Sequence, residues 1–215
     1  MFVITADQIG SRNGPDLAGE ARDLIENRYG RSLSLPADRT AGDEIQMLTE
    51  DAATTLAIVL GLTREKVWSV GVGCGSVRMP LPEATREATG SAFYAAREAV
   101  ERAKKKNPTR FALRTGAQAE EEITPGIWPT AQDAEALIDL LLATRTRRSE
   151  AGWELYDLLE SGLTQQEAAA RLGITPPSAS SRARAADLKI ERLSIGALTR
   201  LLGTLDEQTT TNGTD

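Results

Sequence analysis

Apolar and polar positions alternate along the first half of the chain in blocks of strand and helix length. Residues 2–6, Phe-Val-Ile-Thr-Ala, form an unbroken apolar run of the kind found in a central strand. Strand patterns recur at 33–39, 44–48, 66–73 and 111–113, and helical stripes at 16–29, 51–60 and 85–105. Up to residue 73 these elements follow the order β-α-β-β-α-β, which predicts a sheet with helices and places the chain in the α+β class.

Beyond Pro129 the strand patterns stop and every later segment has the pattern of a helix. The first helical stripe has the i, i+3, i+4, i+7, i+8 spacing and consists of Ala134, Leu137, Ile138, Leu141 and Leu142. We therefore expect one domain over 1–126, an all-α domain over 127–203 and a disordered polar tail over 204–215.

Composition and the N-terminal segment indicate the cellular compartment of the protein. The sequence has 215 residues, 40% hydrophobic and 26% charged, and no run approaches the roughly 20 apolar residues of a membrane span. The N-terminal segment has no basic leader and reaches an acid at Asp7. These features predict a cytoplasmic protein that does not interact with membranes.

The absence of histidine excludes several kinds of site. With no histidine there is no Ser-His-Asp triad, no Cys-His pair and no His-ligated zinc, so metal chemistry must use carboxylates. The single Cys74 cannot form an internal disulfide. Because the net charge is -6, a surface that binds nucleic acid has to be local.

A pair of helices with a short turn is predicted near the C-terminus. Thr164 and Glu167 have the spacing of a capping box, Gly173 is placed to end the first helix, and Ile174 is an apolar plug for the turn. Thr175 followed by Pro176 then begins a second helix. The combination indicates a helix-turn-helix.

The second of these helices, over 177–188, has a small and basic outer face. Short hydroxyl side chains let a helix approach base edges and phosphates closely, and arginine bonds either partner in two places. The predicted contacts with double-stranded DNA are Thr175, Ser178, Ser180, Ser181, Arg182 and Arg184. The alternative is an ordinary antiparallel helix pair, in which Gly173 is a simple C-cap and the arginines are only solvated.

The stretch from Gly162 through Thr175 to Arg184 resembles the last region of sigma factors and related regulators. That resemblance implies that the second helix lies in the major groove of DNA. The sequence departs from the pattern at Pro177 and Ala179, where a glycine and a branched apolar residue are common, and the departure affects the details of docking.

Acidic residues at two strand ends suggest a cation site. Asp7 lies at the end of the first strand, and Asp43 lies in the turn of the following hairpin beside Glu44. Mg²⁺ is commonly held by one or two carboxylates together with substrate phosphates, which makes this a hypothesis for a nucleotide site. The alternative is that Gly42 and Asp43 form an ordinary turn and that Asp7 caps a loop.

Four segments, at 6–12, 40–46, 70–73 and 90–99, look like those of SatD-type proteins. Such proteins are distantly similar to class III nucleotidyl cyclases and diguanylate cyclases, which implies a ferredoxin-like, palm-shaped sheet. By this resemblance Asp7 and Asp43 are metal ligands for Mg²⁺ and Arg97 reaches a phosphate of the nucleotide. Cyclases carry an asparagine about one turn before that arginine, whereas Phe93 and Tyr94 stand here.

The sequence thus favours a DNA-binding transcriptional regulator whose N-terminal domain senses a nucleotide or another partner. The alternatives are a two-metal, cyclase-like enzyme with a regulatory helical region, and a noncatalytic scaffold. A homodimer is expected because one helix-turn-helix rarely covers enough DNA for tight binding. The apolar stripe at 137–142 is a candidate dimer surface, or it packs between the two domains.

Overall fold

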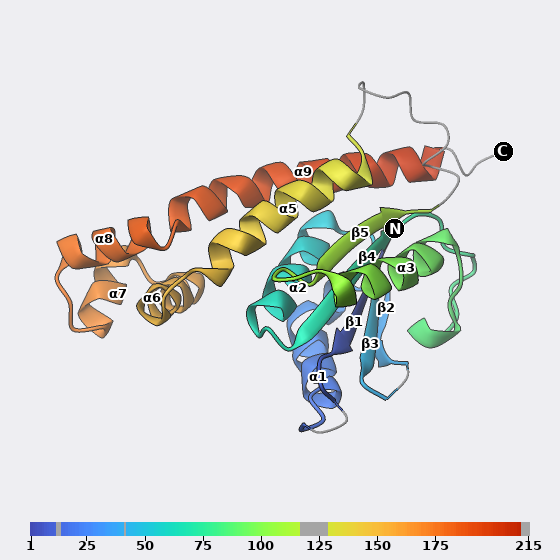
Figure 1. Ribbon diagram of the computed structural model, residues 1–215, viewed down its shortest axis with the longest axis horizontal. Helices are drawn as coiled ribbons and strands as arrows, with labels where there is room; N and C mark the ends of the chain where they lie inside the picture. The colour runs from blue at the N-terminus through green and yellow to red at the C-terminus, as the bar shows by residue number, and fades with distance from the viewer. Residues whose placement is uncertain (12–13, 41, 117–128, 212–215) are drawn as a thin grey trace. The chain divides into compact units, whose positions relative to one another are not determined.

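The structure is a computed structural model that describes residues 1–11, 14–40, 42–116 and 129–211 (Figure 1). Contacts divide the chain into two compact units, which are Met1–Asp139 with Leu198–Asp215, and Leu140–Ala197. The expected division at 126/127 lies outside the described residues. Two long helices, α5 (Ala131–Thr146) and α9 (Leu188–Thr211), contribute residues to both units.

The first unit contains a five-stranded mixed sheet, which confirms the α+β class. Its strands are β1 (Phe2–Gln8), β2 (Leu35–Arg39), β3 (Glu44–Thr49), β4 (Trp68–Cys74) and β5 (Phe111–Thr115). They lie in the order β2-β3-β1-β4-β5, with β5 parallel to β4 and every other pair antiparallel. The 111–113 segment therefore extends the sheet by one strand beyond the β-α-β-β-α-β scheme.

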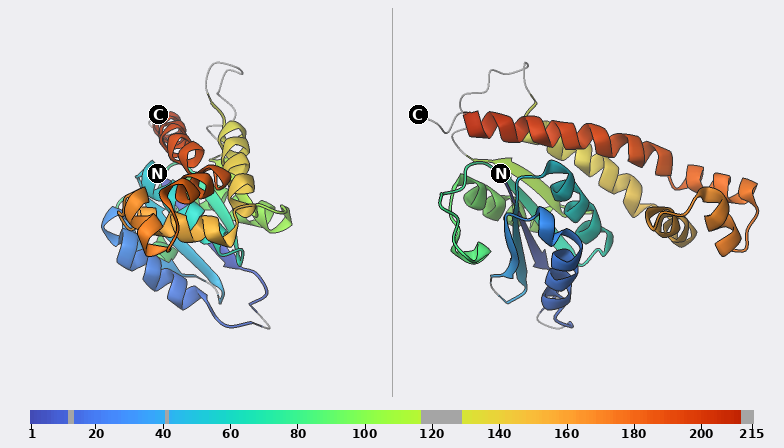
Figure 2. Two further views of the ribbon diagram at one scale, coloured as in Figure 1. Left: turned by 90° about the vertical axis from the view of Figure 1, so that its left-hand side faces the viewer. Right: turned by 180° about the vertical axis from the view of Figure 1, so that it is seen from behind.

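Helices cover both faces of this sheet. Figures 1 and 2 show α1 (Ala18–Tyr29) and α2 (Ala52–Arg64) on one face and α3 (Ser91–Lys105) on the other. The prediction of a helix over 85–105 was wrong for the residues before Ser91. Thr85–Glu87 form a short 3-10 helix, and Gly90, with a φ of +148°, breaks the chain direction before α3 begins.

Strand β4 has its glycines on the face that carries α3. A Cβ atom added at Gly71 would lie 2.2 Å from the backbone nitrogen of Val100, and one at Gly73 would lie 2.1 Å from the carbonyl oxygen of Ala92. The backbones of α3 and β4 therefore approach as closely as they do because these two side chains are absent.

The outer edge of β5 is occupied by a side chain from α5. Glu135 is buried, and its Oε2 accepts a hydrogen bond from the backbone N–H of Leu113 at 2.7 Å. Its Oε1 accepts from Arg102 at 3.0 Å and from Lys106 at 2.7 Å. Two cations and one amide thus compensate the carboxylate for the loss of water on burial.

Asp51 is the N-cap of α2. Its carboxylate accepts hydrogen bonds from the backbone N–H groups of Ala53 and Thr54 and from the hydroxyl of Thr54. The Thr54 hydroxyl makes the largest contribution and, with the two amides, outweighs burial and lowers the pKa of Asp51 below its ordinary value of 3.8.

Two substitutions of Asp51 are expected to distinguish the contribution of its charge to stability from that of its hydrogen bonds. Asp51→Ala should lower the free energy of unfolding by about 1 kcal/mol at neutral pH, whereas Asp51→Asn keeps a capping oxygen and should cost less. The wild-type stabilisation is complete above the unfolded pKa and is lost as pH falls through the lowered folded pKa. Urea unfolding between neutral and acidic pH should show that loss in the wild type and not in Asp51→Asn.

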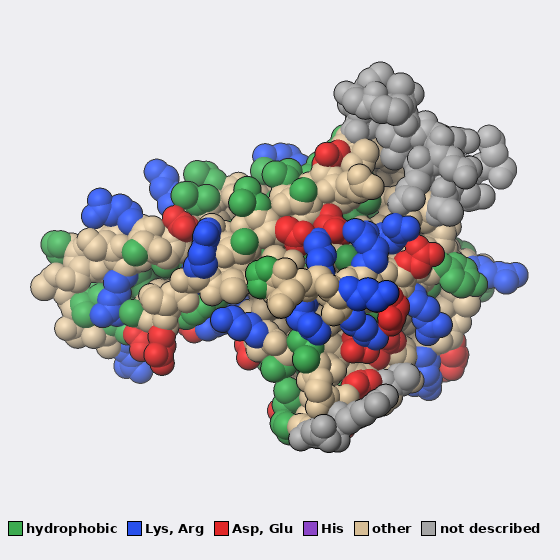
Figure 3. Space-filling model, viewed as in Figure 1, with side chains coloured by type: hydrophobic (Ala, Val, Ile, Leu, Met, Phe, Trp, Pro, Cys, Tyr) green, Lys and Arg blue, Asp and Glu red, His purple; other side chains and the backbone are tan. Residues whose placement is uncertain are grey.

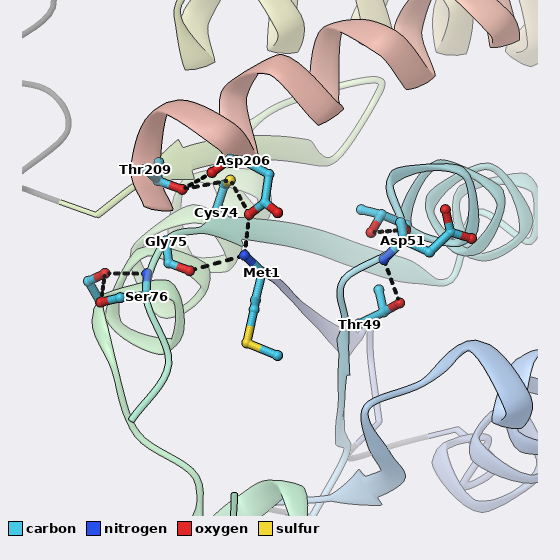
Figure 4. A network of polar contacts seen from close by, with 10 residues as sticks. Met1, Thr49, Asp51, Cys74, Gly75, Ser76, Asp206 and Thr209 are labelled. Atoms are coloured by element: carbon cyan, nitrogen blue, oxygen red, sulfur yellow. Dashed lines mark hydrogen bonds and ion pairs between the residues drawn. The ribbon is translucent and has the colours of Figure 1, made fainter. Parts of the chain in front are cut away.

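The end of the chain differs from the disordered tail expected over 204–215, because residues 204–211 continue α9. Leu205 and Thr209 are buried, and Asp206 forms an ion pair with the N-terminal ammonium of Met1 (Figure 4). The polar composition concealed an inward stripe at Leu198, Leu202 and Leu205. The prediction of disorder was therefore wrong for residues 204–211, and 212–215 lie outside the described residues.

The same contacts enclose Cys74 at the end of β4. Its sulfur lies 3.6 Å from Asp206 Oδ1 and 3.7 Å from the hydroxyl of Thr209 (Figure 4). Burial, followed by the negative charge of Asp206, raises the pKa of the Cys74 thiol to about 12. A thiol with that pKa stays protonated and unreactive at neutral pH.

The second unit, Leu140–Ala197, contains α6 (Glu150–Glu160), α7 (Gln165–Arg171), α8 (Pro176–Ala185), and parts of α5 and α9. Its core consists of Leu155, Ala168, Ala186 and Leu188. Across the ranges that the structure describes, no helix has the length and apolar character needed to cross a membrane.

Candidate nucleic-acid interface

The capping box expected at the start of α7 is present. The hydroxyl of Thr164 accepts from the backbone N–H of Glu167 at 3.2 Å, and Glu167 Oε2 accepts from the backbone N–H of Thr164 at 2.8 Å. The hydroxyl of Thr164, followed by its backbone N–H, lowers the pKa of Glu167. Two backbone amides at the helix start are thereby satisfied by local residues alone.

The turn between α7 and α8 is fixed by residues close together in the sequence. Gly173 has a φ of +66°, and the N–H of Ile174 donates to the carbonyl oxygen of Ala169 at 3.0 Å. Thr175 is the N-cap of α8, its hydroxyl accepts from the N–H of Ser178 at 3.3 Å, and Pro176 is the first helical residue. A helix stop and a helix start therefore follow one another within four residues.

Helix α8 packs on α6 and α7 through small residues. Ala179 and Ala186 are buried, and Ala183 is partly buried against the core of the unit. These alanines lie three to four residues apart and form one face of the helix. The opposite face is exposed and carries Ser181 and Arg184.

The six predicted DNA contacts do not all lie on one side of α8. Thr175, Ser178, Ser181 and Arg184 are exposed, and Arg184 Nη2 donates to Ser181 Oγ at 3.3 Å. Because successive residues are separated by about 100° around a helix, Arg182 and Arg184 lie roughly 200° apart.

The two partly buried members occupy opposite flanks. Ser180 accepts a hydrogen bond from Gln165 of α7 at 2.7 Å. Arg182 lies on the α6 side, 3.7 Å from Glu154 Oε2. Ser181 and Arg184 are therefore the most outward of the six, with Arg182 at the margin.

Helix α6 and the region formed by α8 with the start of α9 carry exposed charges of opposite sign. Helix α6 has no basic residue and four exposed acids, which are Glu150, Glu154, Asp157 and Glu160. The exposed bases of α8 and the first turns of α9 are Arg184, Lys189 and Arg192. The α3 face of the first unit differs, because acidic and basic side chains lie side by side there (Figure 3) and pair as Arg114–Glu98 and Lys106–Asp139.

A buried ionic cluster that the sequence did not reveal supports the same unit. Arg145 and Arg148 both form ion pairs with Glu191 of α9, and all three side chains are at most 5% exposed. The guanidinium of Arg148 lies 4.3 Å from the ring centroid of Trp153, and that of Arg145 lies 4.8 Å from it. These two arginines hold the unit together and are not available to a partner.

The two acids predicted to share a cation have different partners. Asp7 lies opposite Glu44 in the sheet, and its carboxylate is 2.9 Å from the ammonium of Lys104. Burial acts to lower the pKa of Lys104, but hydrogen bonds to Glu101 and Asp7 raise it above the ordinary value. The Asp43 carboxylate instead accepts from the hydroxyl of Ser11.

The position of Asp43 is set by its backbone, whose carbonyl accepts from the N–H of Gln8 at 3.1 Å. Asp43 lines a hollow of about 420 Å³ with Ser11, Asp16, Arg39 and Gly42. Asp7 and the exposed Arg97 of α3 are not among the residues that line it.

One oxygen of Asp7 is already paired with Lys104, and one oxygen of Asp43 is already bonded to Ser11. Within the described ranges, no group of three or more acidic, cysteine or histidine side chains is placed to hold a metal ion. The Mg²⁺ site and the role of Arg97 in nucleotide binding stay predictions.

Local sequence signals thus located the two helices and their caps, and four of the six residues predicted to contact DNA are exposed. The buried arginine cluster arises from packing between segments that lie far apart in the sequence. Comparison with known proteins found no family model, curated protein or solved structure that matches this chain.

Proposed function

We propose that this protein is a DNA-binding transcriptional regulator in which α7 and α8 form a helix-turn-helix and α8 enters the major groove. The observation that carries the proposal is the outer face of α8. Exposed Ser178 and Ser181 lie there with Arg184, whose one hydrogen-bond partner within the described residues is the Ser181 hydroxyl.

The shape of α8 suits a groove that is about 12 Å wide. Short side chains at the N-terminal end allow close approach, and a guanidinium can bond guanine or phosphate in two places. The four acids of α6 would be repelled by phosphate, so they favour an orientation in which α8 and the start of α9 face the DNA.

The first unit serves as the sensing part of the regulator in this proposal. The strand order β2-β3-β1-β4 supports the idea of a ferredoxin-like sheet, which the resemblance to SatD-type proteins implies. The hollow beside Asp43 is the candidate site for a nucleotide or another ligand. Two copies of the chain would place two α8 helices on paired half-sites, which is the usual means by which such a motif gains affinity.

Binding to duplexes selected from a random pool tests the proposal. Wild-type affinity is expected to fall steeply as salt rises. Arg184→Ala should weaken binding about tenfold and reduce the salt slope by about one if the guanidinium contacts phosphate. Arg182→Ala should have a smaller effect because Glu154 already neutralises part of that charge.

Arg31→Ala is the matched control, because Arg31 is exposed in the first unit and its removal changes the net charge equally. That variant should bind duplex as the wild type does. Wild-type protein that binds no duplex at low salt, or that loses as much affinity on Arg31→Ala as on Arg184→Ala, would refute the proposal.

A further inference from the structure

A hollow of about 600 Å³ lies on the surface of the Leu140–Ala197 unit, beside α8. It is formed by the first residue of α7, one flank of α8 and the start of α9. The residues that line it are Gln165, Ser180, Ala183, Arg184, Asp187, Lys189 and Ile190. Its volume falls in the range of about 300–1,000 Å³ that is typical of sites for small molecules.

The wall of the hollow is largely apolar. Ala183 and Ile190 provide hydrocarbon surface, and Ile190 is 59% exposed although it is a large aliphatic residue. At the rim, the Gln165 amide donates to the Ser180 hydroxyl, so these two polar groups hold one another in place. A ligand that covers Ile190 would remove apolar surface from water.

The charges around the hollow favour an anion. Arg184 and Lys189 contribute two positive charges and Asp187 one negative charge. In the part of the chain that the structure describes, neither Arg184 nor Lys189 forms an ion pair with a carboxylate, and Arg184 is bonded to the hydroxyl of Ser181. The complementary ligand therefore has an apolar body and one negative group.

We propose that this hollow binds a small amphipathic anion, such as an aromatic carboxylate or sulfonate, and that the bound anion competes with DNA. Arg184 is the link, because it lines the hollow and belongs to the outer face of α8. When an anion pairs with the guanidinium of Arg184, that guanidinium is no longer available to contact the major groove of DNA. The competition rests on the proposed DNA binding, whereas the binding of the anion does not.

The probe for the site is 1-anilinonaphthalene-8-sulfonate, which has two aromatic rings and a single negative charge. Its fluorescence should rise on binding to the full chain. N-phenyl-1-naphthylamine has the same rings without the sulfonate and should bind about fivefold more weakly, because it leaves the excess positive charge without a partner.

Paired variants on α9 locate the probe. Ile190→Gln should weaken binding of the sulfonate about tenfold, and Leu193→Gln should leave it unchanged, since Leu193 is 68% exposed on the same helix and does not line the hollow. Lys189→Gln should weaken binding about threefold and Arg192→Gln should not. All four positions are exposed, so the fold should tolerate the changes.

Competition is measured by titrating the sulfonate into the complex of protein and selected duplex. The sulfonate should displace the wild-type protein from the duplex at concentrations about tenfold lower than those needed to displace Ile190→Gln. The affinity of Ile190→Gln for the duplex is expected to equal that of the wild type. Equal effects of Ile190→Gln and Leu193→Gln on the probe, or equal binding of the neutral probe, overturn the proposed site.

A loss of duplex affinity in Ile190→Gln with no loss of probe binding would assign the hollow to DNA and also overturn the proposal. The two proposals can fail separately. Site-specific probe binding by a protein that binds no duplex would retain the anion site and remove the regulator.

Discussion

Glu191→Gln is expected to lower the free energy of unfolding of the Leu140–Ala197 unit by about 3–5 kcal/mol, which is enough to unfold a marginal unit. The carboxylate is the partner of Arg145 and Arg148, and all three groups are buried. Removal of its charge takes away the carboxylate that pairs with two buried guanidinium groups, both of which lie against the ring of Trp153. Urea unfolding followed by hydrogen exchange at the amides of α6 and α8 measures the loss.

Two variants identify the cause of that loss. Glu160→Gln removes an exposed carboxylate from the same unit and should change stability by less than about 0.5 kcal/mol. The triple variant Arg145→Met, Arg148→Met and Glu191→Leu replaces the whole cluster with apolar side chains and should recover most of the stability. A Glu191→Gln protein as stable as Glu160→Gln would show that the two arginines do not need this carboxylate.

Gly73→Ala is expected to destabilise the first unit by about 3 kcal/mol or more, and few properly folded molecules should remain near body temperature. The added Cβ would lie 2.1 Å from the carbonyl oxygen of Ala92 and 2.3 Å from the nitrogen of Ala96. Both atoms belong to the backbone of α3, so the clash cannot be relieved by a change of rotamer. Thermal unfolding monitored by circular dichroism measures the effect.

Gly61→Ala is the matched substitution in α2. No atom outside its own helix lies within 4 Å of the position that its Cβ would occupy. Alanine is favoured over glycine in a helix, so this variant should be more stable by about 0.5–1 kcal/mol. Opposite signs for the two changes are expected, and a tolerated Gly73→Ala would mean that α3 can move away from β4 at little cost.

Signals confined to neighbouring residues made the second unit the easier one to predict. Thr164, Glu167, Gly173 and Thr175 each act on backbone groups within about five positions, and the structure shows all four in those roles. The small and basic residues on the outer face of α8 were also predicted from the sequence of that helix. The neighbour of Arg182 did not follow from local signals, because Glu154 belongs to α6, which lies more than 20 residues earlier in the sequence.

Predictions that depended on distant partners fared less well. The polar composition after Leu202 suggested disorder, yet Leu205 and Asp206 join α9 to residues near the N-terminus and to Cys74. Arg145 and Arg148 lie near the end of the helix that the stripe at 134–142 predicts, and their partner Glu191 lies more than 40 residues away. Spacing in the sequence contains no record of such pairings.

The partners of the acids at the strand ends also could not be predicted from the sequence. Asp7 lies in β1 and Asp43 lies in the turn just before the neighbouring strand β3, but a charged partner of Asp7, Lys104, comes from α3. Nothing within a few residues of Asp7 indicates that Lys104 arrives there. Adjacent strands define which backbones meet, while side-chain contacts depend on what covers each face of the sheet.

Glu135 has a consequence for the way copies of this chain meet one another. An outermost strand normally offers its free amides to any extended segment, including the same strand of another molecule. At Leu113 that amide already donates to a carboxylate, and two cations hold the carboxylate in place. The sheet cannot recruit a sixth strand at this position without first expelling a buried charge, so the edge of β5 resists assembly into larger β-structures.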